Sequence, residues 1–390
     1  MKILVVCQYY APEPFRISDM CEELVKRGHE VTILTGVPNY PMGEVYPGYE
    51  KSADTEEVIN GVKVIRCKTI PRGKDTIHRL LNYFSYPFFA GKKVKQLDKD
   101  FDVVFVNQLS PVMMVWPAIK YCKKNGKKAV MYCLDLWPAS LSAGGMSPSS
   151  PIYKFFGWLS MGVYRKMDVI LNTSKMFEKY LVDEFGIDKD KIKHLPQYAE
   201  GIFDDVGSVD DEYVDLMFAG NIGTAQSLET VIKAAKEVKR ADVHWHIVGD
   251  GQDLERIKKM AEGMENVIFY GRKPLEEMPE YYKKADAMLV TLMKDDVISL
   301  TLPGKVQTYM AAGKPIISAA DGETKVTVED AECGFAVGSE DWNGLARAVE
   351  AFADSDWKKL GKNSREYFDA NYQRKLFFDR LEKALEEQSI

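Results

Sequence analysis

The chain has 390 residues, 46% of them hydrophobic and 28% charged, a composition typical of a globular protein with more than one buried core. Its 52 Lys and Arg against 58 Asp and Glu give a net charge of −6, which argues against a general nucleic-acid-binding protein. The six cysteines include no CxxC pair, and no long apolar core follows the opening MKILVV. We therefore expect a reducing, cytoplasmic setting and no signal peptide.

The first half of the chain alternates strand and helix patterns. Residues 3–7 form a continuous apolar run, as in a parallel strand covered on both faces. A helical pattern follows over 18–27 and a second strand over 31–35, and this spacing predicts a right-handed βαβ unit. Further buried strands are predicted at 62–67, 103–106, 129–133 and 169–171.

Two loops of this half follow predicted strands, at the edge where open α/β sheets bind ligands. The loops cover 9–16 and 36–49, and the second is rich in Pro, Gly and Tyr. They can be ligand-binding loops or structural turns, and the sequence leaves both interpretations open. Asp135 falls at the end of another predicted strand, at the same edge.

Two segments combine aromatic and basic residues. Residues 72–97 place five Phe and Tyr among Lys and Arg, and residues 152–167 repeat this composition. A basic-aromatic amphipathic stretch suits the membrane interface. The alternative is a core helix with solvated lysines, but the repetition favours a surface that faces a membrane.

The pattern loosens near 201–213, which is polar and acidic, and we expect an interdomain linker there. Strand and helix patterns then restart, and the last thirty or so residues, from 360, form charged amphipathic helices. The sequence thus predicts two successive doubly wound α/β halves that face each other across a cleft. The expected elements of the second half are strands at 216–219, 243–248, 267–270, 287–292 and 315–318, with helices at 227–240 and 253–263.

Three strands of the second half end in glycine turns, at 219–223, 248–252 and 269–272. Glycine lets a backbone approach a ligand closely, and the helix after such a turn directs free N–H groups at it. Lys305 opens a fourth helix, after Pro303 and Gly304. Alone it can be an ordinary surface lysine, but these loops converge at one sheet edge, and together they predict a nucleotide site.

With these motifs in view, the chain resembles the family-4 glycosyltransferases of the GT-B fold, above all the bacterial subgroup that builds O-antigens and capsules. The resemblance covers essentially the whole length and rests on RGHEVTILTGVPNYP, DLWP, AGNIG, VGDG and PGKVQTYMAAGKPI. It implies two Rossmann-like domains, an acceptor-side domain at 1–198 and a donor-binding domain at 199–371, with a terminal helix at about 372–390 that packs back on the first domain.

The resemblance also implies roles for individual residues. Asp135 and Lys305 would be catalytic. Acceptor-binding residues would be Glu13, Arg16, Asn39 and Tyr40. Residues that hold the donor's diphosphate, ribose or base would be Gly220, Asn221, Gly223, Thr224, Asp250, Tyr270, Gly271, Arg272, Pro303, Gly304 and Thr308.

The sequence departs from the family pattern at four places. Leu300 and Thr308 stand where members commonly carry two glutamates that grip the donor sugar and the ribose, Thr224 replaces a frequent arginine, and Leu134 replaces a histidine. An unusual donor, deoxy or N-acetylated, or reduced activity would fit these changes. The DxD string 100–102, a metal signature in some glycosyltransferases, lies at the amino end of a strand and is interpreted as a turn.

The resulting expectation is a retaining, metal-independent glycosyltransferase without a cofactor, which moves a sugar from a UDP-sugar to a lipid-linked saccharide in bacterial surface polysaccharide synthesis. It would be cytoplasmic and peripheral to the inner face of the membrane. Two alternatives are an inactive donor-binding partner of an assembly complex and a GT-B sugar-nucleotide epimerase. The missing acidic pair argues against the epimerase, because moving protons needs poised carboxylates.

Overall fold

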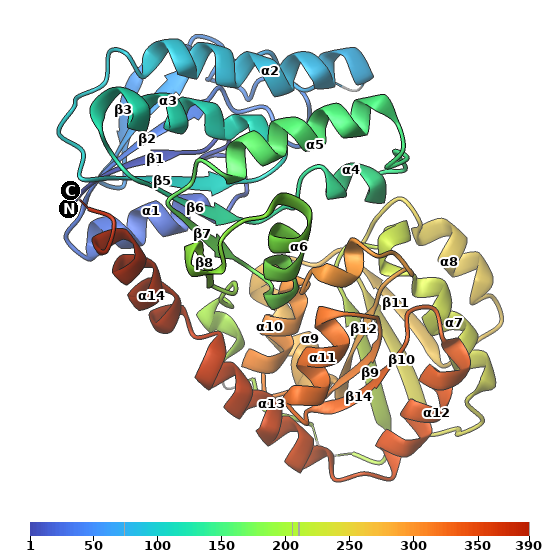
Figure 1. Cartoon of the computed structure of the whole chain (residues 1–390). Helices are drawn as coiled ribbons and strands as arrows, with labels where there is room; N and C mark the ends of the chain where they lie inside the picture. Colours follow the sequence, from blue (N-terminus) through green and yellow to red (C-terminus); the bar gives the residue numbers. More distant parts are fainter. Residues whose placement is uncertain (74, 205, 210, 390) are drawn as a thin grey trace. The chain divides into compact units, whose positions relative to one another are not determined.

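The computed structural model describes residues 1–73, 75–204, 206–209 and 211–389, and it divides into two compact units (Figure 1). The first unit contains residues 1–173, 177–195 and 378–390, and the second contains residues 174–176 and 196–377. Each unit is an α/β layer structure built on one sheet. No helix within the described ranges is long and apolar enough to cross a bilayer.

The first unit is built on an eight-stranded sheet with the order β3-β4-β2-β1-β5-β6-β7-β8. All neighbouring strands are parallel except β3, which runs antiparallel at one edge. Continuous apolar runs form the central strands because both of their faces are covered. The strands are β1 (Lys2–Val6), β2 (Glu30–Gly36), β3 (Glu56–Ile59), β4 (Val62–Cys67), β5 (Val103–Gln108), β6 (Ala129–Cys133), β7 (Val169–Asn172) and β8 (Ile192–His194).

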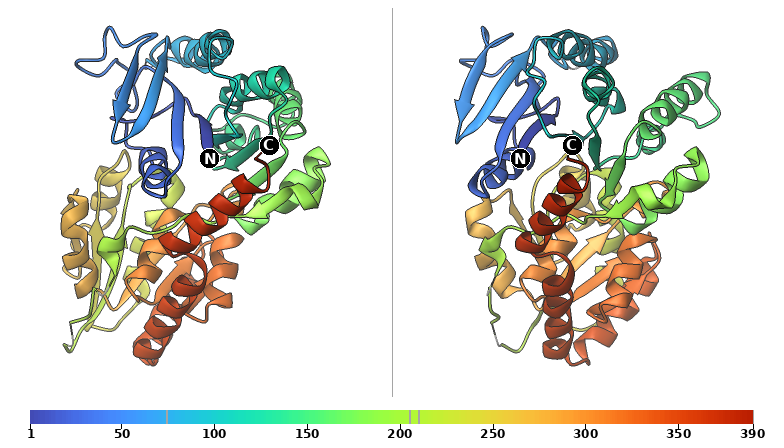
Figure 2. Two further views of the ribbon diagram at one scale, coloured as in Figure 1. Left: turned by 90° about the vertical axis from the view of Figure 1, so that its left-hand side faces the viewer. Right: turned by 60° about the vertical axis from the view of Figure 1, so that its left-hand side comes forward.

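Helices cover both faces of this sheet. In Figures 1 and 2, α2, α3 and α5 lie side by side on one face, and α1 lies on the other. The helices are α1 (Ile17–Lys26), α2 (Thr76–Lys93), α3 (Trp116–Asn125), α4 (Ala139–Ala143), α5 (Pro151–Tyr164) and α6 (Lys175–Phe185), with 3₁₀ turns η1 (Val112–Val115) and η2 (Lys189–Lys191).

The terminal helix α14 (Arg374–Glu386) ends in the first unit. Arg27, at the end of α1, donates to Asp379 at 2.9 Å and to Glu382 at 2.7 Å, and its guanidinium lies over the ring of Phe378. The ring of His29 pairs with the same Glu382 at 2.8 Å. Charged and aromatic contacts therefore fix the end of the chain beside α1.

The second unit has a six-stranded, fully parallel sheet with the order β11-β10-β9-β12-β13-β14. Its strands are β9 (Val214–Ala219), β10 (Val243–Val248), β11 (Val267–Gly271), β12 (Ala287–Thr291), β13 (Ile316–Ala319) and β14 (Gly334–Val337). Its helices are α7 (Leu228–Glu237), α8 (Leu254–Met260), α9 (Met278–Lys284), α10 (Gly304–Ala311), α11 (Glu323–Asp330), α12 (Trp342–Ala353) and α13 (Trp357–Asn371), with 3₁₀ turns η3 (Gly201–Phe203), η4 (Thr224–Gln226), η5 (Leu275–Glu277) and η6 (Ile298–Leu300).

The second sheet has a core on each face. One core packs α7, α8 and α12 against the sheet, around the buried Trp245. The other packs α9, α10, α11 and α13, around Tyr309 and Met310. Helices on both faces of a mostly parallel sheet define a doubly wound α/β fold.

The strand positions predicted from the sequence are confirmed, but three strands were not expected: β3, β8 and β14. They are short and lie at sheet edges, where one-sided pairing requires no long apolar run. The expected linker at 201–213 begins with packed structure, because Phe203 of η3 is buried and stacks on Tyr282 with ring centroids 4.9 Å apart. Positions 205 and 210 of this segment lie outside the described residues. The DxD string lies beside β1: the backbone N–H of Lys2 donates to Asp102, and its side-chain amine donates to Asp100. These contacts agree with the interpretation of the string as a turn.

Candidate donor and acceptor sites

The carboxyl ends of β9 and β10 are joined through glycines that admit no side chain. A Cβ on Gly249 would lie 1.8 Å from the carbonyl oxygen of Gly220, and one on Gly251 would lie 2.2 Å from that of Ile222. Gly220 and Gly249 also have φ of 144° and 145°, which L-residues rarely adopt. The loops after the two strands are therefore packed backbone to backbone, and their shape depends on these residues being glycine.

Helix α10 is fixed to the end of β9 by one side chain. The hydroxyl of Tyr309 donates to the carbonyl oxygen of Ala219 at 2.9 Å and accepts from its N–H at 3.1 Å. Tyr309 is fully buried. This double contact places the first turn of α10 directly beside the loop 220–223.

Lys305 lies in that first turn. Its amine donates to the side-chain oxygen of Gln226 at 2.6 Å and lies 3.9 Å from the centroid of the Phe218 ring. A Cβ on Gly220 would lie 3.1 Å from the amine, so a larger residue at position 220 would crowd the lysine. Among the described residues, no carboxylate lies within ion-pair distance, and burial lowers the pKa of the Lys305 amine to about 7.

The N-terminus of α10 adds to this positive region. Pro303 is its N-cap, and no described side chain caps the helix there. The first N–H groups of an uncapped helix, together with the helix dipole, favour a bound anion. A cation without a carboxylate beside an open helix N-terminus is suited to a phosphate or diphosphate.

In the sequence, Leu300 precedes the first turn of α10 and Thr308 follows it. The Thr308 hydroxyl donates to the carbonyl oxygen of Lys305 at 2.9 Å, so its proton is already used, while its lone pairs can still accept a hydrogen bond. Leu300 ends η6 and is half-buried. Neither side chain brings a negative charge to this turn.

The remaining predicted donor residues surround the same edge. Tyr270 points away from it, because its hydroxyl pairs with His246 Nδ1 at 2.9 Å, so its backbone remains for a ligand. Gly271 has a φ of 67° and accepts from Gly249 N–H at 2.9 Å, and Arg272 is exposed. The exposed members are Asn221, Thr224 and Asp250, while Gly223 is buried.

In the first unit, Glu13 joins the two predicted loops. It is buried, and its carboxylate accepts from the N–H groups of Tyr10 at 3.2 Å, Asn39 at 2.8 Å and Tyr40 at 2.7 Å. Burial raises the pKa of Glu13 to about 7, although these hydrogen bonds oppose the rise. The carboxylate holds the loops in place and leaves little of itself exposed to a ligand.

The surface that these loops expose is aromatic. The ring of Tyr40 lies 5.0 Å from that of Phe15, and the guanidinium of Arg72 lies over Tyr40 at 5.8 Å. Asn39 is buried and accepts from the N–H of Arg72 at 3.0 Å. Arg16 is half-buried at the start of α1. Aromatic faces with a nearby cation suit the stacking of a sugar ring.

Asp135 follows β6, with its carboxylate positioned by two neighbours. Oδ2 accepts from the Ser110 hydroxyl and from Trp137 Nε1 at 3.1 Å, and Trp137 Nε1 also donates to Ser110 at 2.7 Å. Burial raises the pKa of Asp135, although the hydrogen bonds from Ser110 and Trp137 oppose the rise. Ser110 and Trp137 thus hold one carboxylate oxygen in a fixed orientation, and a carboxylate held in this way suits a polar substrate group.

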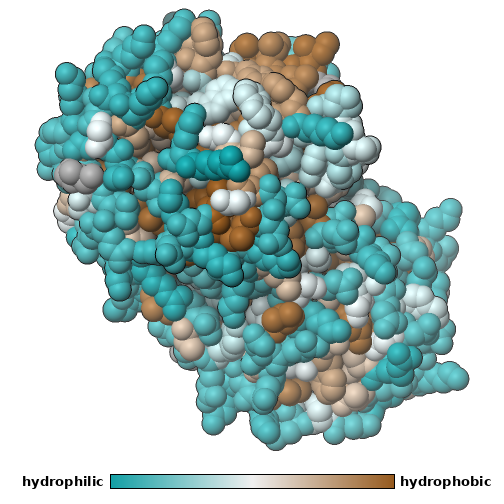
Figure 3. Space-filling view, in the orientation of Figure 1, coloured by the Kyte–Doolittle hydropathy of each residue, from teal (hydrophilic) through white to brown (hydrophobic). Residues whose placement is uncertain are grey.

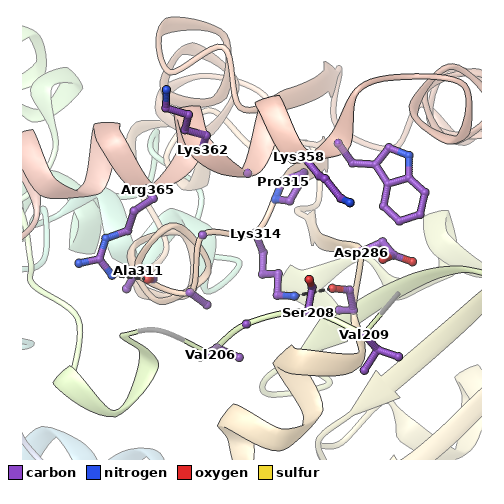
Figure 4. A pocket seen from close by; sticks show the side chains of 16 residues that line it. Val206, Ser208, Val209, Asp286, Ala311, Lys314, Pro315, Lys358, Lys362 and Arg365 are labelled. Atoms are coloured by element: carbon purple, nitrogen blue, oxygen red, sulfur yellow. Dashed lines mark hydrogen bonds between the residues drawn. The ribbon is translucent and has the colours of Figure 1, made fainter. Parts of the chain in front are cut away.

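A cavity of about 380 Å³ in the second unit lies at the opposite, amino-terminal ends of β12 and β13 (Figure 4). Two of its cations have structural partners. Lys314 donates to the carbonyl oxygen of Ala285 at 2.8 Å. Arg365 donates to the carbonyl oxygen of Ala311 at 2.8 Å and to the carboxylate of Asp204 at 2.7 Å. Lys314 and Arg365 thus satisfy the carbonyl groups that follow α9 and end α10. The cavity is therefore explained by packing and is not the donor site.

One cluster has the residue types of a metal site: Asp215, His244 and His246, whose ligand atoms lie within 4.8 Å of one another. The carboxylate of Asp215 pairs with His246 at 2.8 Å and with His244 at 3.4 Å. These pairs already satisfy the three side chains. The cluster lies near the amino-terminal end of β9, at the far end of the strand from the glycine loops.

Four partner residues were not identified from the sequence: Gln226, Phe218, Ser110 and Trp137. Gln226, Phe218 and Ser110 each touch a predicted residue that is distant in the chain, and no local motif marks such a contact. Trp137 was the only one with a signal, since it lies in the DLWP phrase that carries the resemblance.

Comparisons with known proteins agree with this geometry. Residues 202–374 match the family described as Glycosyl transferases group 1, and residues 16–197 match Glycosyltransferase Family 4. Among curated relatives, the putative colanic acid biosynthesis glycosyl transferase WcaI of Escherichia coli K12 is 26% identical over 84% of this chain and 85% of its own length.

Solved structures show the same fold. Sucrose-phosphate synthase from Thermosynechococcus elongatus superposes with a TM-score of 0.77 at 16% identity, covering 99% of this chain and 98% of that one. HepE of Anabaena, in complex with UDP-glucose, superposes with a TM-score of 0.69 at 12% identity, covering 99% and 100%. The two doubly wound units and these matches define a glycosyltransferase of the GT-B fold. The chain belongs to the family-4, group 1 glycosyltransferases, and the resemblance seen in its sequence is confirmed.

Proposed function

We propose that the protein moves a sugar from a UDP-sugar to a lipid-linked saccharide during the synthesis of a bacterial surface polysaccharide. The observation that carries the donor half is Lys305, a half-buried amine with no carboxylate partner among the described residues, beside an uncapped helix N-terminus and two glycine loops. A diphosphate supplies the negative charge that this arrangement lacks.

The choice of UDP is supported by HepE, which has been solved with UDP-glucose, although at 12% identity that likeness extends only to the fold. The polysaccharide role is supported by WcaI, which is named for colanic acid biosynthesis. The saccharide acceptor would lie on the first unit, against the aromatic loop surface and Asp135. A lipid-linked acceptor would bring the enzyme to the inner face of the membrane.

In the reaction, the bond between the sugar's anomeric carbon and the diphosphate oxygen breaks while the oxygen of an acceptor hydroxyl bonds to the same carbon, and the hydroxyl's proton would pass to Asp135. Negative charge grows on the leaving UDP, where Lys305 and the N–H groups of α10 would stabilise it. These groups would do the work that a divalent cation does in other transferases, so we propose a metal-independent reaction. Retention of the anomeric configuration is proposed from the family resemblance.

The first test is a thermal-shift panel of UDP, GDP, ADP and their sugar conjugates, with and without EDTA. A ligand that binds only the folded state raises the melting temperature. We expect a rise with UDP and with one UDP-sugar, unchanged by EDTA. A rise only with another nucleotide, or only with added Mg²⁺, would contradict the proposed donor or the metal-independent chemistry.

A second candidate function rests on Leu300 and Thr308, which replace charged groups expected to grip the donor. An inactive donor-binding partner would bind UDP yet release none from a UDP-sugar when an acceptor is present. Release of UDP that depends on a lipid-linked saccharide excludes this function. NMR of the product then reports whether the anomeric configuration is retained.

A further inference from the structure

Helix α2 carries an apolar stripe on its outward side, where a surface helix usually carries polar side chains. Its outward side chains are Ile77, Leu80, Leu81, Phe84 and Phe88, at helical spacing, and Ile77 is 70% and Phe88 57% exposed. Figure 3 shows hydrophobic residues gathered along the upper edge of the view, where Figure 1 draws α2.

The inward side of α2 carries polar groups. Asn82 is fully buried, accepts from Gln8 at 2.9 Å and donates to the carbonyl oxygen of Ile70 at 2.7 Å, and Ser85 accepts from the Ile70 N–H at 2.9 Å. These polar contacts, together with the fully buried Tyr86 and Ala90, attach the helix to the unit, and the apolar stripe is left on the outside. Burial in this chain's own core does not explain the stripe.

Helix α5 continues the same surface. Its exposed residues include Ile152, Phe155 and Trp158, and Trp158 is 64% exposed. Phe84 of α2 lies 6.3 Å from the ring of Trp116, at the start of α3, and Trp116 and Trp158 line one shallow hollow. We call these exposed side chains of α2 and α5, with Trp116 between them, the α2–α5 surface.

Basic side chains predominate around the α2–α5 surface, and the acidic N-cap of α2, Asp75, is paired with His78. Residues 76–97 contain four Lys or Arg and no Asp or Glu, and residues 136–167 contain three Lys or Arg and no Asp or Glu, in a chain whose net charge is −6. Lys92 lies over the ring of Phe88 at 4.2 Å, and Lys154 and Lys166 are exposed on or beside α5. The cations thus border the apolar side chains.

We propose that the α2–α5 surface docks onto an anionic lipid bilayer, with its apolar side chains among the acyl chains and its cations at the headgroups. Apolar burial combined with attraction to anionic lipid is the physics of interfacial helices. We favour an anionic bilayer over a protein partner because it offers negative charge all round an apolar interior, which matches cations that border the apolar side chains. The inference rests on the proposed function for its purpose, since a lipid-linked acceptor lies in a membrane.

The test is co-sedimentation of the full chain with vesicles of phosphatidylcholine alone or of phosphatidylcholine and phosphatidylglycerol at a 3:1 ratio. The test variant is the double substitution Ile77→Glu and Phe155→Glu. The matched control, Val58→Glu and Leu275→Glu, changes two exposed apolar residues that do not belong to helix α2 or α5. We expect strong wild-type binding to the anionic vesicles only, a partition coefficient reduced at least about tenfold in the test variant, and a change below about twofold in the control.

Equal wild-type binding to both vesicle types, or equal loss in the test and control variants, would overturn the proposal. A wild-type dimer in analytical ultracentrifugation that the test variant converts to monomer would also overturn it, in favour of a second copy on the surface. If the test variant does not fold, brominated lipid supplies a second readout. It should quench tryptophan fluorescence of the wild type, and Trp158→Phe should remove much of that quenching.

The two proposals fail separately. Vesicle binding needs no donor, and UDP binding in the thermal-shift panel needs no membrane. A protein that binds UDP but no vesicle overturns only the docking surface. A protein that binds anionic vesicles but no nucleotide overturns only the proposed function.

Discussion

The amine of Lys305 lies 2.6 Å from the side-chain oxygen of Gln226. Gln226 belongs to η4, just after the loop that follows β9. Its side chain is a neutral amide, so it hydrogen-bonds the amine without forming an ion pair. A neutral partner holds the amine in place without neutralising it. No carboxylate among the described residues therefore competes with an incoming anion for this amine, and the first two predictions below depend on that.

Replacing Lys305 with Met keeps the length of the side chain and removes the charge. Charge-assisted hydrogen bonds contribute about 1.5–3 kcal/mol each, and removing one donor to a developing oxyanion commonly costs about 10²–10³ in rate. We expect sugar transfer to fall about 100-fold and UDP affinity to fall with it. Lys325→Met, an exposed lysine of α11, is the control. Full activity in Lys305→Met would remove Lys305 from the mechanism.

Donor binding should depend on pH through the same amine. Its pKa is lowered to about 7 in the free protein, and a bound diphosphate raises it, so binding takes up a proton above pH 7. Affinity for a UDP-sugar should be full below pH 7 and fall by up to about tenfold per pH unit above it. Calorimetry in two buffers of different ionisation enthalpy measures the proton uptake. Proton uptake that persists in Lys305→Met would assign it to another group.

Asp135→Asn preserves an oxygen that can accept from Ser110 and Trp137 while removing the charge. We expect transfer to fall about 100-fold, in the range typical of acid–base groups, with UDP binding unchanged because the donor residues lie in the other unit. The raised pKa predicts that the wild-type rate increases with pH as this carboxyl ionises, and that the variant loses that limb of the pH profile. A variant that keeps the limb would show that another group titrates.

Tyr309→Phe removes a hydroxyl that both donates to and accepts from the backbone of Ala219. Leaving these buried groups without a partner costs about 1–3 kcal/mol, so we expect the second unit to melt about 5 °C lower. Tyr213→Phe, at an exposed position, is the control. UDP should also bind more weakly, since α10 loses its attachment to β9. An unchanged melting temperature would mean that packing alone holds α10.

The central strands could be predicted from the sequence because a strand covered on both faces must be apolar throughout. Residues 3–7, 129–133 and 243–248 show this pattern without interruption. The edge strands β3 and β14 lack it, since only one side of each is paired. The glycine turns were also visible, because the close approach of Gly249 to Gly220 allows no other residue.

The sequence did not reveal how the predicted residues are used. Glu13 was expected to face the acceptor, and its role there stays a prediction, but three backbone N–H groups from two loops converge on its carboxylate. Tyr270 was expected beside the base, and its hydroxyl is paired with His246 on the face of the sheet. Such partners come from distant segments, and no spacing in the chain records them.

By itself, the sequence determined the fold class, the order of the strands along the chain and the family, because periodicity and glycine turns are local properties of the chain. Only the tertiary structure decided the electrostatics of Lys305 and the polarity of α2. An amine loses its ordinary pKa through burial beside Phe218, and an apolar stripe becomes a docking surface only when polar residues such as Asn82 turn inward. Both effects depend on which groups meet in space, and packing of the whole chain sets that.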